Sequence, residues 1–201
     1  MTKELVLALW DRDFSWIDQI SNDIRITKYN KNINTLKSGE IFLSPNVGRD
    51  VHTFFYHIVN NYYTLADYTF FSQDYKEDHV SIYQEIINGD VSNIPNYAIQ
   101  DLGGCWFFND DPIHCRIFET DKVGSPYHDN LPIQDIWNMI FKDEVPDVLY
   151  FTPAGHFCIT REHVHKNTKE TYENILKILE TNEMAPWCIE RLEPYIFKKI
   201  I

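Results

Sequence analysis

The first apolar run of the chain is short and uninterrupted. It extends from Leu5 to Trp10 and is closed by charged residues. A continuous apolar run of this length predicts a strand that is buried on both faces, as in a parallel sheet. The next segments predict, in order, a loop with a short helix in "DRDFSWIDQI", a second strand in "DIRITKYNK" and a short extended segment in "IFLS".

From Asp50 the apolar residues change to helical spacing. The segment "DVHTFFYHIVNNYYTL", residues 50–65, places Val51, Phe54, Phe55 and Ile58 on one face and predicts a helix. "DYTFFSQD" then predicts another buried strand. Strands that alternate with helices predict an α/β fold, with a mostly parallel central sheet flanked by helices. Ligands of such folds bind at the carboxyl ends of the strands.

The second half of the chain is less regular. The stretch from Ile94 to Asn130 reads as loops with short strands. Apolar spacing elsewhere predicts helices over 77–89, 131–141 and 167–182, and two strands within 146–165.

The ends of the last two helices carry sequence signals. Asn167 or Thr168 is expected to cap the helix over 167–182, with Glu170 at capping-box distance from Asn167. A final helix is expected over 185–197, and Pro194 should interrupt or end it because proline lacks a backbone N–H.

Composition narrows the class of protein. The 201 residues suit a single domain, and 44% hydrophobic with 15% aromatic residues suffice for a real core. A net charge of -12 argues against a broad basic surface for nucleic acid. The first apolar run is too short for a signal peptide or a membrane span, so we expect a soluble cytoplasmic protein. No C-x-x-C pair occurs, and free buried thiols are expected at the four cysteines, Cys105, Cys115, Cys158 and Cys188.

The stretch "NVGRD" lies where the third extended segment becomes a helix. Gly48 permits a backbone that other residues resist, and a helix that starts at Arg49 or Asp50 presents free N–H groups and a positive dipole end. Two interpretations stay open. In one, Asn46 caps the helix and Arg49 pairs with a surface carboxylate. In the other, Arg49 binds phosphate while Asp50 accepts hydrogen bonds from a base or ribose.

Several blocks resemble one family. "NVGRDVHTFFYHIVNNYYTLADYTFFSQD" is similar to the N-V-G-R-E signature of a family described only as a domain of unknown function, with members in fungi and large viruses. "LWDRDFSWI", "ITKYNK", "GHFCITREHVHKNTKETYENIL" and "IERLEPYIF" are similar to its other blocks, in the same order and over nearly the whole chain. The layout of that family resembles nucleotide-sugar glycosyltransferases of the GT-A type, and its N-x-G-R block resembles that of rhamnan-synthesis glycosyltransferases.

This resemblance implies an enzyme of hexosyltransferase type that moves a sugar from a nucleotide-diphosphate donor, such as a UDP-sugar, to a glycan or another hydroxyl acceptor. It implies one GT-A-like domain over 1–201, with a nucleotide-binding half in 1–75 and an acceptor-side half in 76–201. A divalent cation, Mn²⁺ or Mg²⁺, would hold the diphosphate.

The resemblance also assigns site residues. Asp74 takes the place of the metal-binding motif, although "SQDY" offers one carboxylate where two are usual, and Asp78 is a second ligand only if its loop folds back. Magnesium often uses only one or two protein carboxylates. The positions that match nucleotide-sugar contacts are Asp11, Asp13, Asn30, Asn46, Gly48, Arg49, Asp50 and Gln73.

The acceptor side offers weaker candidates. Glu190 suits a general base that takes the acceptor proton, or pairs with Arg191 on a helix face. His156 suits a contact to acceptor or phosphate, or a buried hydrogen-bonded position. Trp106 suits stacking on a sugar ring. The aromatic residues Phe54, Phe55, Tyr62 and Tyr63 are more typical of a core than of a sugar platform.

Two other functions compete with transfer. The missing second carboxylate favours a module that binds a nucleotide or glycan without turnover. A nucleotidyltransferase or hydrolase acting on another phosphate ester is the second rival. The chain lacks the Walker motif and the G-x-S-x-G elbow, which argues against P-loop enzymes and serine hydrolases.

Overall fold

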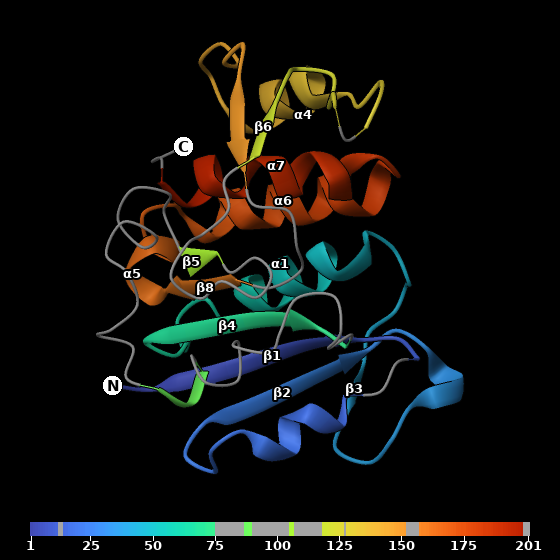
Figure 1. The fold of residues 1–201 in the computed structure, drawn as a ribbon, viewed down its shortest axis with the longest axis vertical. Coiled ribbons are helices and arrows are strands. Elements are labelled where there is room, and N and C mark those ends of the chain that lie inside the picture. Colours follow the sequence, from blue (N-terminus) through green and yellow to red (C-terminus); the bar gives the residue numbers. More distant parts are fainter. Residues whose placement is uncertain are drawn as a thin grey trace.

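The fold is built on a central sheet whose first strands form where the apolar runs predict them (Figure 1). The computed structural model describes residues 1–11, 14–74, 87–89, 105–106, 118–126, 128–151 and 157–198. Within these ranges the main sheet has six strands in the order β3-β2-β1-β4-β8-β5. Their bounds are β1 Lys3–Leu9, β2 Arg25–Asn30, β3 Ile41–Phe42, β4 Tyr68–Gln73, β5 Cys105–Trp106 and β8 Phe157–Thr160.

The sheet is mostly parallel, as the alternation of strands and helices predicts. β1 pairs in parallel with both β2 and β4, and β3 pairs in parallel with β2. β8 runs antiparallel between β4 and β5. The protein therefore has the predicted α/β architecture, with helices packed against one mixed but predominantly parallel sheet.

Side chains of β1 alternate between two hydrophobic clusters. Val6 and Ala8 face a large cluster that helices α1, α4, α6 and α7 complete. Leu5, Leu7 and Leu9 face a smaller one. Because both faces are covered, every position of β1 after Lys3 is buried. The bounds of the helices are α1 Arg49–Asn61, α4 Ile133–Ile140, α6 Lys169–Thr181 and α7 Ala185–Lys198.

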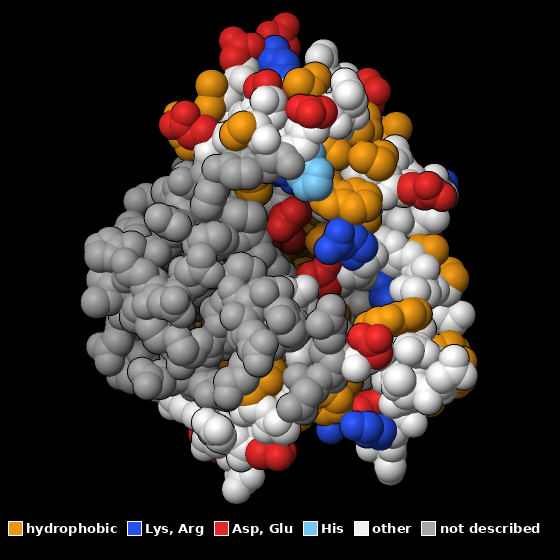
Figure 2. All heavy atoms as spheres, turned by 45° about the vertical axis from the view of Figure 1, so that its right-hand side comes forward, with side chains coloured by type: hydrophobic (Ala, Val, Ile, Leu, Met, Phe, Trp, Pro, Cys, Tyr) orange, Lys and Arg blue, Asp and Glu red, His pale blue; other side chains and the backbone are white. Residues whose placement is uncertain are grey.

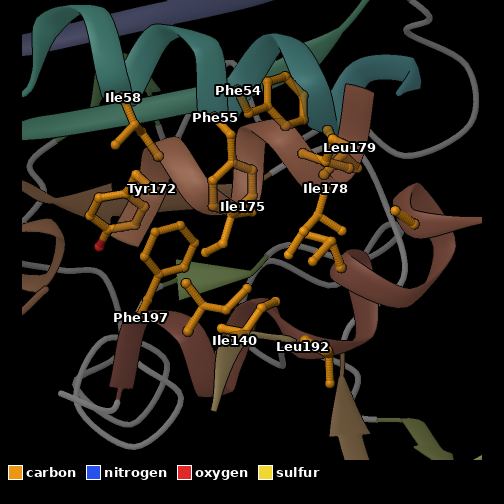
Figure 3. Close-up of a cluster of buried hydrophobic side chains, with 14 of the residues drawn as sticks. Phe54, Phe55, Ile58, Ile140, Tyr172, Ile175, Ile178, Leu179, Leu192 and Phe197 are labelled. Carbon is orange, nitrogen blue, oxygen red and sulfur yellow. The ribbon is translucent and has the colours of Figure 1, made fainter. Parts of the chain in front are cut away.

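The larger cluster joins the sheet to the carboxyl-terminal helices. Phe54, Phe55 and Ile58 of α1 meet Tyr172 and Ile175 of α6, and Phe197 of α7 closes the layer (Figure 3). In Figure 1, α4 and a two-stranded sheet lie at the top of the view, beyond α6 and α7. This second sheet pairs β6 Phe118–Thr120 with β7 Leu149–Phe151.

The smaller cluster covers the opposite face of the main sheet. The 3-10 helix η1, Ser15–Gln19, buries Trp16 and Ile17 there, and Ile20 and Ile24 follow. Two further short elements complete the described fold, the 3-10 helix η2 Ile33–Thr35 and the helix α5 Arg161–Val164.

The start of α6 confirms one of the two predicted caps. Thr168 caps α6, since its side chain accepts a hydrogen bond from the Thr171 backbone N–H. Asn167 precedes this cap, and its side-chain amide donates a hydrogen bond to the carbonyl of Ile196 at 2.7 Å.

The prediction that Pro194 interrupts the last helix is wrong. α7 continues through Pro194 to Lys198. Proline removes one intrahelical hydrogen bond. The buried residues on either side, Leu192 and Ile196, belong to the large hydrophobic cluster. Their packing offsets the lost hydrogen bond.

Other predictions fall partly outside the described residues. The expected helix over 77–89 is described only at 87–89. Of the cysteines whose side chains are described, Cys158 and Cys188 are free and buried, as expected. None of the helices in the described ranges combines the length and the apolar character that crossing a bilayer requires.

Candidate functional site

The carboxyl ends of the parallel strands meet at one edge of the sheet. From β1 the chain proceeds to β2 and β3 on one side, whereas β4 lies on the other side of β1. The strand order therefore reverses between β1 and β4. In open α/β sheets such a switch point opens a crevice, because the connections leave the two neighbouring strands in opposite directions.

A cavity of about 340 Å³ lies at this switch point. The ends of β1 and β4 and the first turn of α1 contribute its walls. In Figure 2, basic, acidic and hydrophobic side chains gather around a hollow on this face. The cavity is lined by Ala8, Leu9, Trp10, Lys31, Asn46, Arg49, Asp50, Thr53, Gln73 and Asp74. Five of the predicted site residues thus surround one space: Asn46, Arg49, Asp50, Gln73 and Asp74.

A second cavity of about 380 Å³ shares Leu9, Trp10 and Asp74 with the first. Its walls combine apolar and hydrogen-bonding side chains from the loops after β1 and β2. The remaining lining residues are Asp11, Phe14, Asn30, Asn34, Thr35, Leu36 and Lys37. The two cavities adjoin along the end of β1, so an elongated ligand can occupy both.

The turn before α1 has an unusual backbone. Gly48 adopts a left-handed conformation with φ of 64°, and Arg49 follows with φ of 54°. A non-glycine residue in this region costs about 1 kcal/mol or more. The ammonium group of Lys31 holds the turn by donating hydrogen bonds to the carbonyls of Val47, at 2.6 Å, and Arg49. The strained turn thus depends on a lysine from the end of β2.

Substitution of Gly48 by Ala is expected to destabilise the protein more than substitution of Gly39. Both glycines have positive φ, so each variant loses about 1–2 kcal/mol for the backbone. A Cβ at Gly48 would also lie 2.6 Å from the Cβ of His52, whereas nothing lies within 4 Å at Gly39. Overpacking adds about 1–3 kcal/mol. Urea denaturation of both variants measures the difference, and equal losses would contradict the crowding at Gly48.

Arg49 faces the cavity without a counter-ion among the described side chains. Its guanidinium lies over the Trp187 ring, 5.1 Å from the ring centroid, and the described part of the chain shows no ion pair for it. The interpretation in which Arg49 pairs with a surface carboxylate is therefore not supported within these ranges. A guanidinium placed over an aromatic ring can still present N–H donors to an anion.

Asp74 lines the same cavity, directly after β4. It is 7% exposed, and one carboxylate oxygen accepts a hydrogen bond from the Trp10 backbone N–H at 2.8 Å. This bond joins the ends of β1 and β4 across the switch point. In the ranges that the structure covers, no group of three or more His, Cys, Asp or Glu side chains is placed to hold a metal ion. Asp74 can supply a carboxylate ligand to a cation in this cavity.

Lys31 and Thr53 also line the cavity, and neither was among the predicted site residues. Lys31 is 8% exposed. Burial lowers its pKa from 10.5 to about 8, although the nearby charge of Asp50 acts in the opposite direction. The Thr53 hydroxyl is buried and has no hydrogen-bond partner among the described residues. A buried cation and an unpaired hydroxyl beside one cavity favour a polar ligand.

The chain matches a family profile over residues 5–201, nearly its whole length. It belongs to the DUF3431 family, described as proteins of unknown function. No curated protein and no solved structure gave a significant match. The predicted membership of a family of unknown function is thus confirmed, whereas its link to glycosyltransferases stays a prediction.

In this DUF3431 protein, the residues predicted after β1 and β2 line the second cavity. Asp11 is exposed there. Asn30 is buried and organises its own loop. Its side chain accepts a hydrogen bond from the Asn32 backbone N–H at 2.8 Å and donates to Glu40 at 2.8 Å. Asn30 therefore shapes the cavity wall more than it offers free hydrogen-bonding groups.

The remaining predicted residues of the DUF3431 chain either line neither cavity or lie outside the described parts. Glu190 of α7 is near Arg191, with 3.8 Å between the carboxylate oxygen and Nη1, as one of its two interpretations expects. It is not among the residues that line either cavity. Trp106 belongs to β5, but its side chain lies outside the described structure. So do the predictions for Asp13, Asp78 and His156.

One sequence signal pointed to Lys31 in this DUF3431 chain. The "YNK" block belongs to the resemblance, and a lysine that directly follows a buried strand must lie at the carboxyl edge of the sheet. Thr53 had no comparable signal. Its place on the helix face toward the strand ends depends on how α1 packs.

Proposed function

We propose that this protein transfers a sugar from a nucleoside-diphosphate donor to a hydroxyl acceptor. The observation that carries the proposal is the pair of adjoining cavities at the reversal of strand order, the first of which is lined by Arg49, Lys31 and Asp74. A crevice at this point of an α/β sheet is where such folds bind nucleotides.

The donor would occupy both cavities. Its diphosphate would lie in the first, where the Arg49 guanidinium and the Lys31 ammonium offset its charge. Its nucleoside would extend into the second, where Trp10 and Phe14 provide apolar surface and Asp11 provides a hydrogen-bond acceptor for a ribose hydroxyl. Asp50, at the start of α1, would repel a phosphate group that entered more deeply into the first cavity.

A divalent cation, Mn²⁺ or Mg²⁺, would bind between Asp74 and the donor's phosphate oxygens. One buried carboxylate fits Mg²⁺, which often takes few protein ligands and keeps several waters. Such a cation would neutralise charge on the leaving diphosphate.

The reaction would proceed by displacement at the sugar. The acceptor oxygen forms a bond to the anomeric carbon, the bond from that carbon to the diphosphate oxygen breaks, and the nucleoside diphosphate leaves with the electron pair. In an inverting reaction a carboxylate takes the acceptor proton. The sequence suggested Glu190 for this role, but Glu190 lines neither cavity. Arg49 and Lys31 stabilise the charge that develops on the leaving group.

The single carboxylate at Asp74 favours one alternative. A module that binds a nucleotide or glycan without turnover would need the cavities and Arg49, but no second metal ligand. Such a module would bind the donor and neither hydrolyse it nor transfer its sugar.

Thermal shift separates these functions. UDP-, GDP- and dTDP-sugars are added with Mn²⁺ or with a chelator, and at least one donor is expected to raise the melting temperature further with Mn²⁺. Asp74→Asn should abolish the increment due to Mn²⁺, because it removes the carboxylate proposed to hold the cation. Asp18→Asn, on exposed η1 surface, is the matched control.

Three results decide among the proposals. If Mn²⁺ still raises the melting temperature of the Asp74→Asn variant further in the presence of donor, the cation binds elsewhere. A shift with donor but no hydrolysis or transfer to any acceptor would select the binding module. If an unrelated phosphate ester raises the melting temperature and no nucleotide sugar does, the donor assignment is wrong.

A further inference from the structure

A group of cationic and aromatic side chains adjoins the first cavity around Trp187. Arg49, which lines the cavity, stacks on the Trp187 ring. The His128 ring lies against the same indole, with 6.1 Å between ring centroids. Arg191, one turn further along α7, donates a hydrogen bond to the Trp187 carbonyl at 2.8 Å. Trp187 thus brings together side chains from α1, α7 and the loop before α4.

Arg191 is unusually placed for an arginine. It is 2% exposed, and within the described part of the chain its Nε has no hydrogen-bond partner. Its guanidinium lies 4.7 Å from the centroid of the Phe151 ring. The nearest described carboxylate, Glu190, is 3.8 Å away, at the limit for an ion pair. A buried guanidinium that is only partly compensated favours an anion nearby.

The positive charges of Arg191 and Arg49 also affect the pKa of His128. Its pKa lies below the usual value, first because of partial burial and then because of the charges of Arg191 and Arg49, while Asp129 acts in the opposite direction. The His128 ring and the Arg49 guanidinium both contact the Trp187 ring. A neutral imidazole can donate one N–H.

This positive cluster contrasts with the protein as a whole. The chain carries 30 acidic and 18 basic residues. Cations that gather within one region of an acidic protein produce a local field that attracts and orients an anion. Figure 2 shows a histidine at the rim of the hollow, together with basic, hydrophobic and acidic side chains.

We propose that Arg191, His128 and Trp187 form a subsite for an oxyanion, a carboxylate or a phosphate, carried by the acceptor sugar. This inference rests on the proposed function and specifies its acceptor as an acidic glycan rather than a neutral one. Arg191 binds the oxyanion through its guanidinium, His128 donates a hydrogen bond, and the indole of Trp187 packs against the sugar ring. Arg49 lies between this subsite and the donor diphosphate.

Glucose, glucuronate and glucose 6-phosphate test the subsite, since they differ only at carbon six. Each is titrated into the full chain saturated with UDP, and binding is followed by calorimetry. The two acidic sugars are expected to bind at least about tenfold more tightly than glucose, because each makes charge-assisted hydrogen bonds. A preference for glucuronate would identify a carboxylate ligand, and a preference for glucose 6-phosphate a phosphate ligand.

Variants locate the binding. Arg191→Lys keeps the charge but loses the fork of N–H donors, and should weaken acidic-sugar binding about tenfold while UDP affinity is unchanged. His128→Gln changes an exposed residue, so it keeps the test available if Arg191→Lys fails to fold, and it should also weaken binding. Lys177→Gln, exposed on α6, removes a positive charge elsewhere and is the control.

The outcomes separate the two proposals. If UDP binds and the acidic sugars bind no better than glucose, the acceptor subsite is wrong and the donor site stands. If acidic sugars bind in a manner sensitive to Arg191 and His128 while no nucleotide binds, the subsite stands and the donor proposal fails. If glucose 6-phosphate binds the UDP-free protein and added UDP displaces it, glucose 6-phosphate occupies the first cavity and the inference is overturned.

Discussion

Replacement of Arg49 by Met is expected to weaken UDP binding by about 10- to 150-fold. A hydrogen bond to a charged group contributes about 1.5–3 kcal/mol, and 1.4 kcal/mol corresponds to a factor of ten. Arg49 is exposed, lines the first cavity and makes no ion pair within the described ranges, so its charge is available to a diphosphate. Calorimetric titration with UDP measures the effect.

The folded state of this variant should be nearly unchanged. The stacking of Arg49 on Trp187 at an exposed site contributes about 0.5–1 kcal/mol. Arg49→Lys should recover part of the affinity, since a point charge remains but the fork geometry is lost. Lys142→Met, at an exposed position just after α4, is the control for general charge loss. An unchanged affinity for UDP in Arg49→Met would remove the diphosphate from this cavity.

Replacement of Phe55 by Ala is expected to cost about 3–5 kcal/mol of unfolding free energy. Phe55 is fully buried and stacks on Phe197, with 5.9 Å between centroids and 12° between planes. It also contacts Tyr172 at 6.2 Å, so it joins α1 to α6 and α7 (Figure 3). The cavity left by the ring cannot close without moving three helices.

Tyr63 provides the matched control at the end of the same aromatic stripe. It is 79% exposed, and Tyr63→Ala should change stability by no more than about 0.5 kcal/mol. Urea denaturation of both variants, with the slope compared to the wild type, measures the two effects. A loss below about 1 kcal/mol for Phe55→Ala would mean that the α1 layer is not part of the cooperative core.

Several elements could be predicted from local pattern alone. The run from Leu5 to Trp10 and the helical spacing after Asp50 each encode their own geometry, because the period of apolar residues matches the period of the element. Pro194 shows the limit of local reasoning. Its cost to the helix is local, but the burial of Leu192 and Ile196 that outweighs it depends on distant elements.

Part of the candidate site could likewise be predicted from the sequence, and part could not. The resemblance assigned Arg49, Asp50 and Asp74 to one site, and parallel strands that end at one edge of the sheet account for their lining one cavity. The contacts of Lys31 with the turn before α1 could not be predicted, since they join two loops whose approach depends on strand order. The same holds for Arg49 and Trp187, which are far apart in the chain.

The amino-acid sequence by itself determined the family, the α/β class and the side chains available at the sheet edge, because periodicity and composition are properties of neighbouring residues. Only the tertiary structure decided that β4 pairs with β1 opposite to β2, and hence where the crevice opens. It also decided that Trp187 brings Arg49, His128 and Arg191 into one cluster. Such contacts between distant segments are selected by the packing of whole layers, which no local pattern encodes.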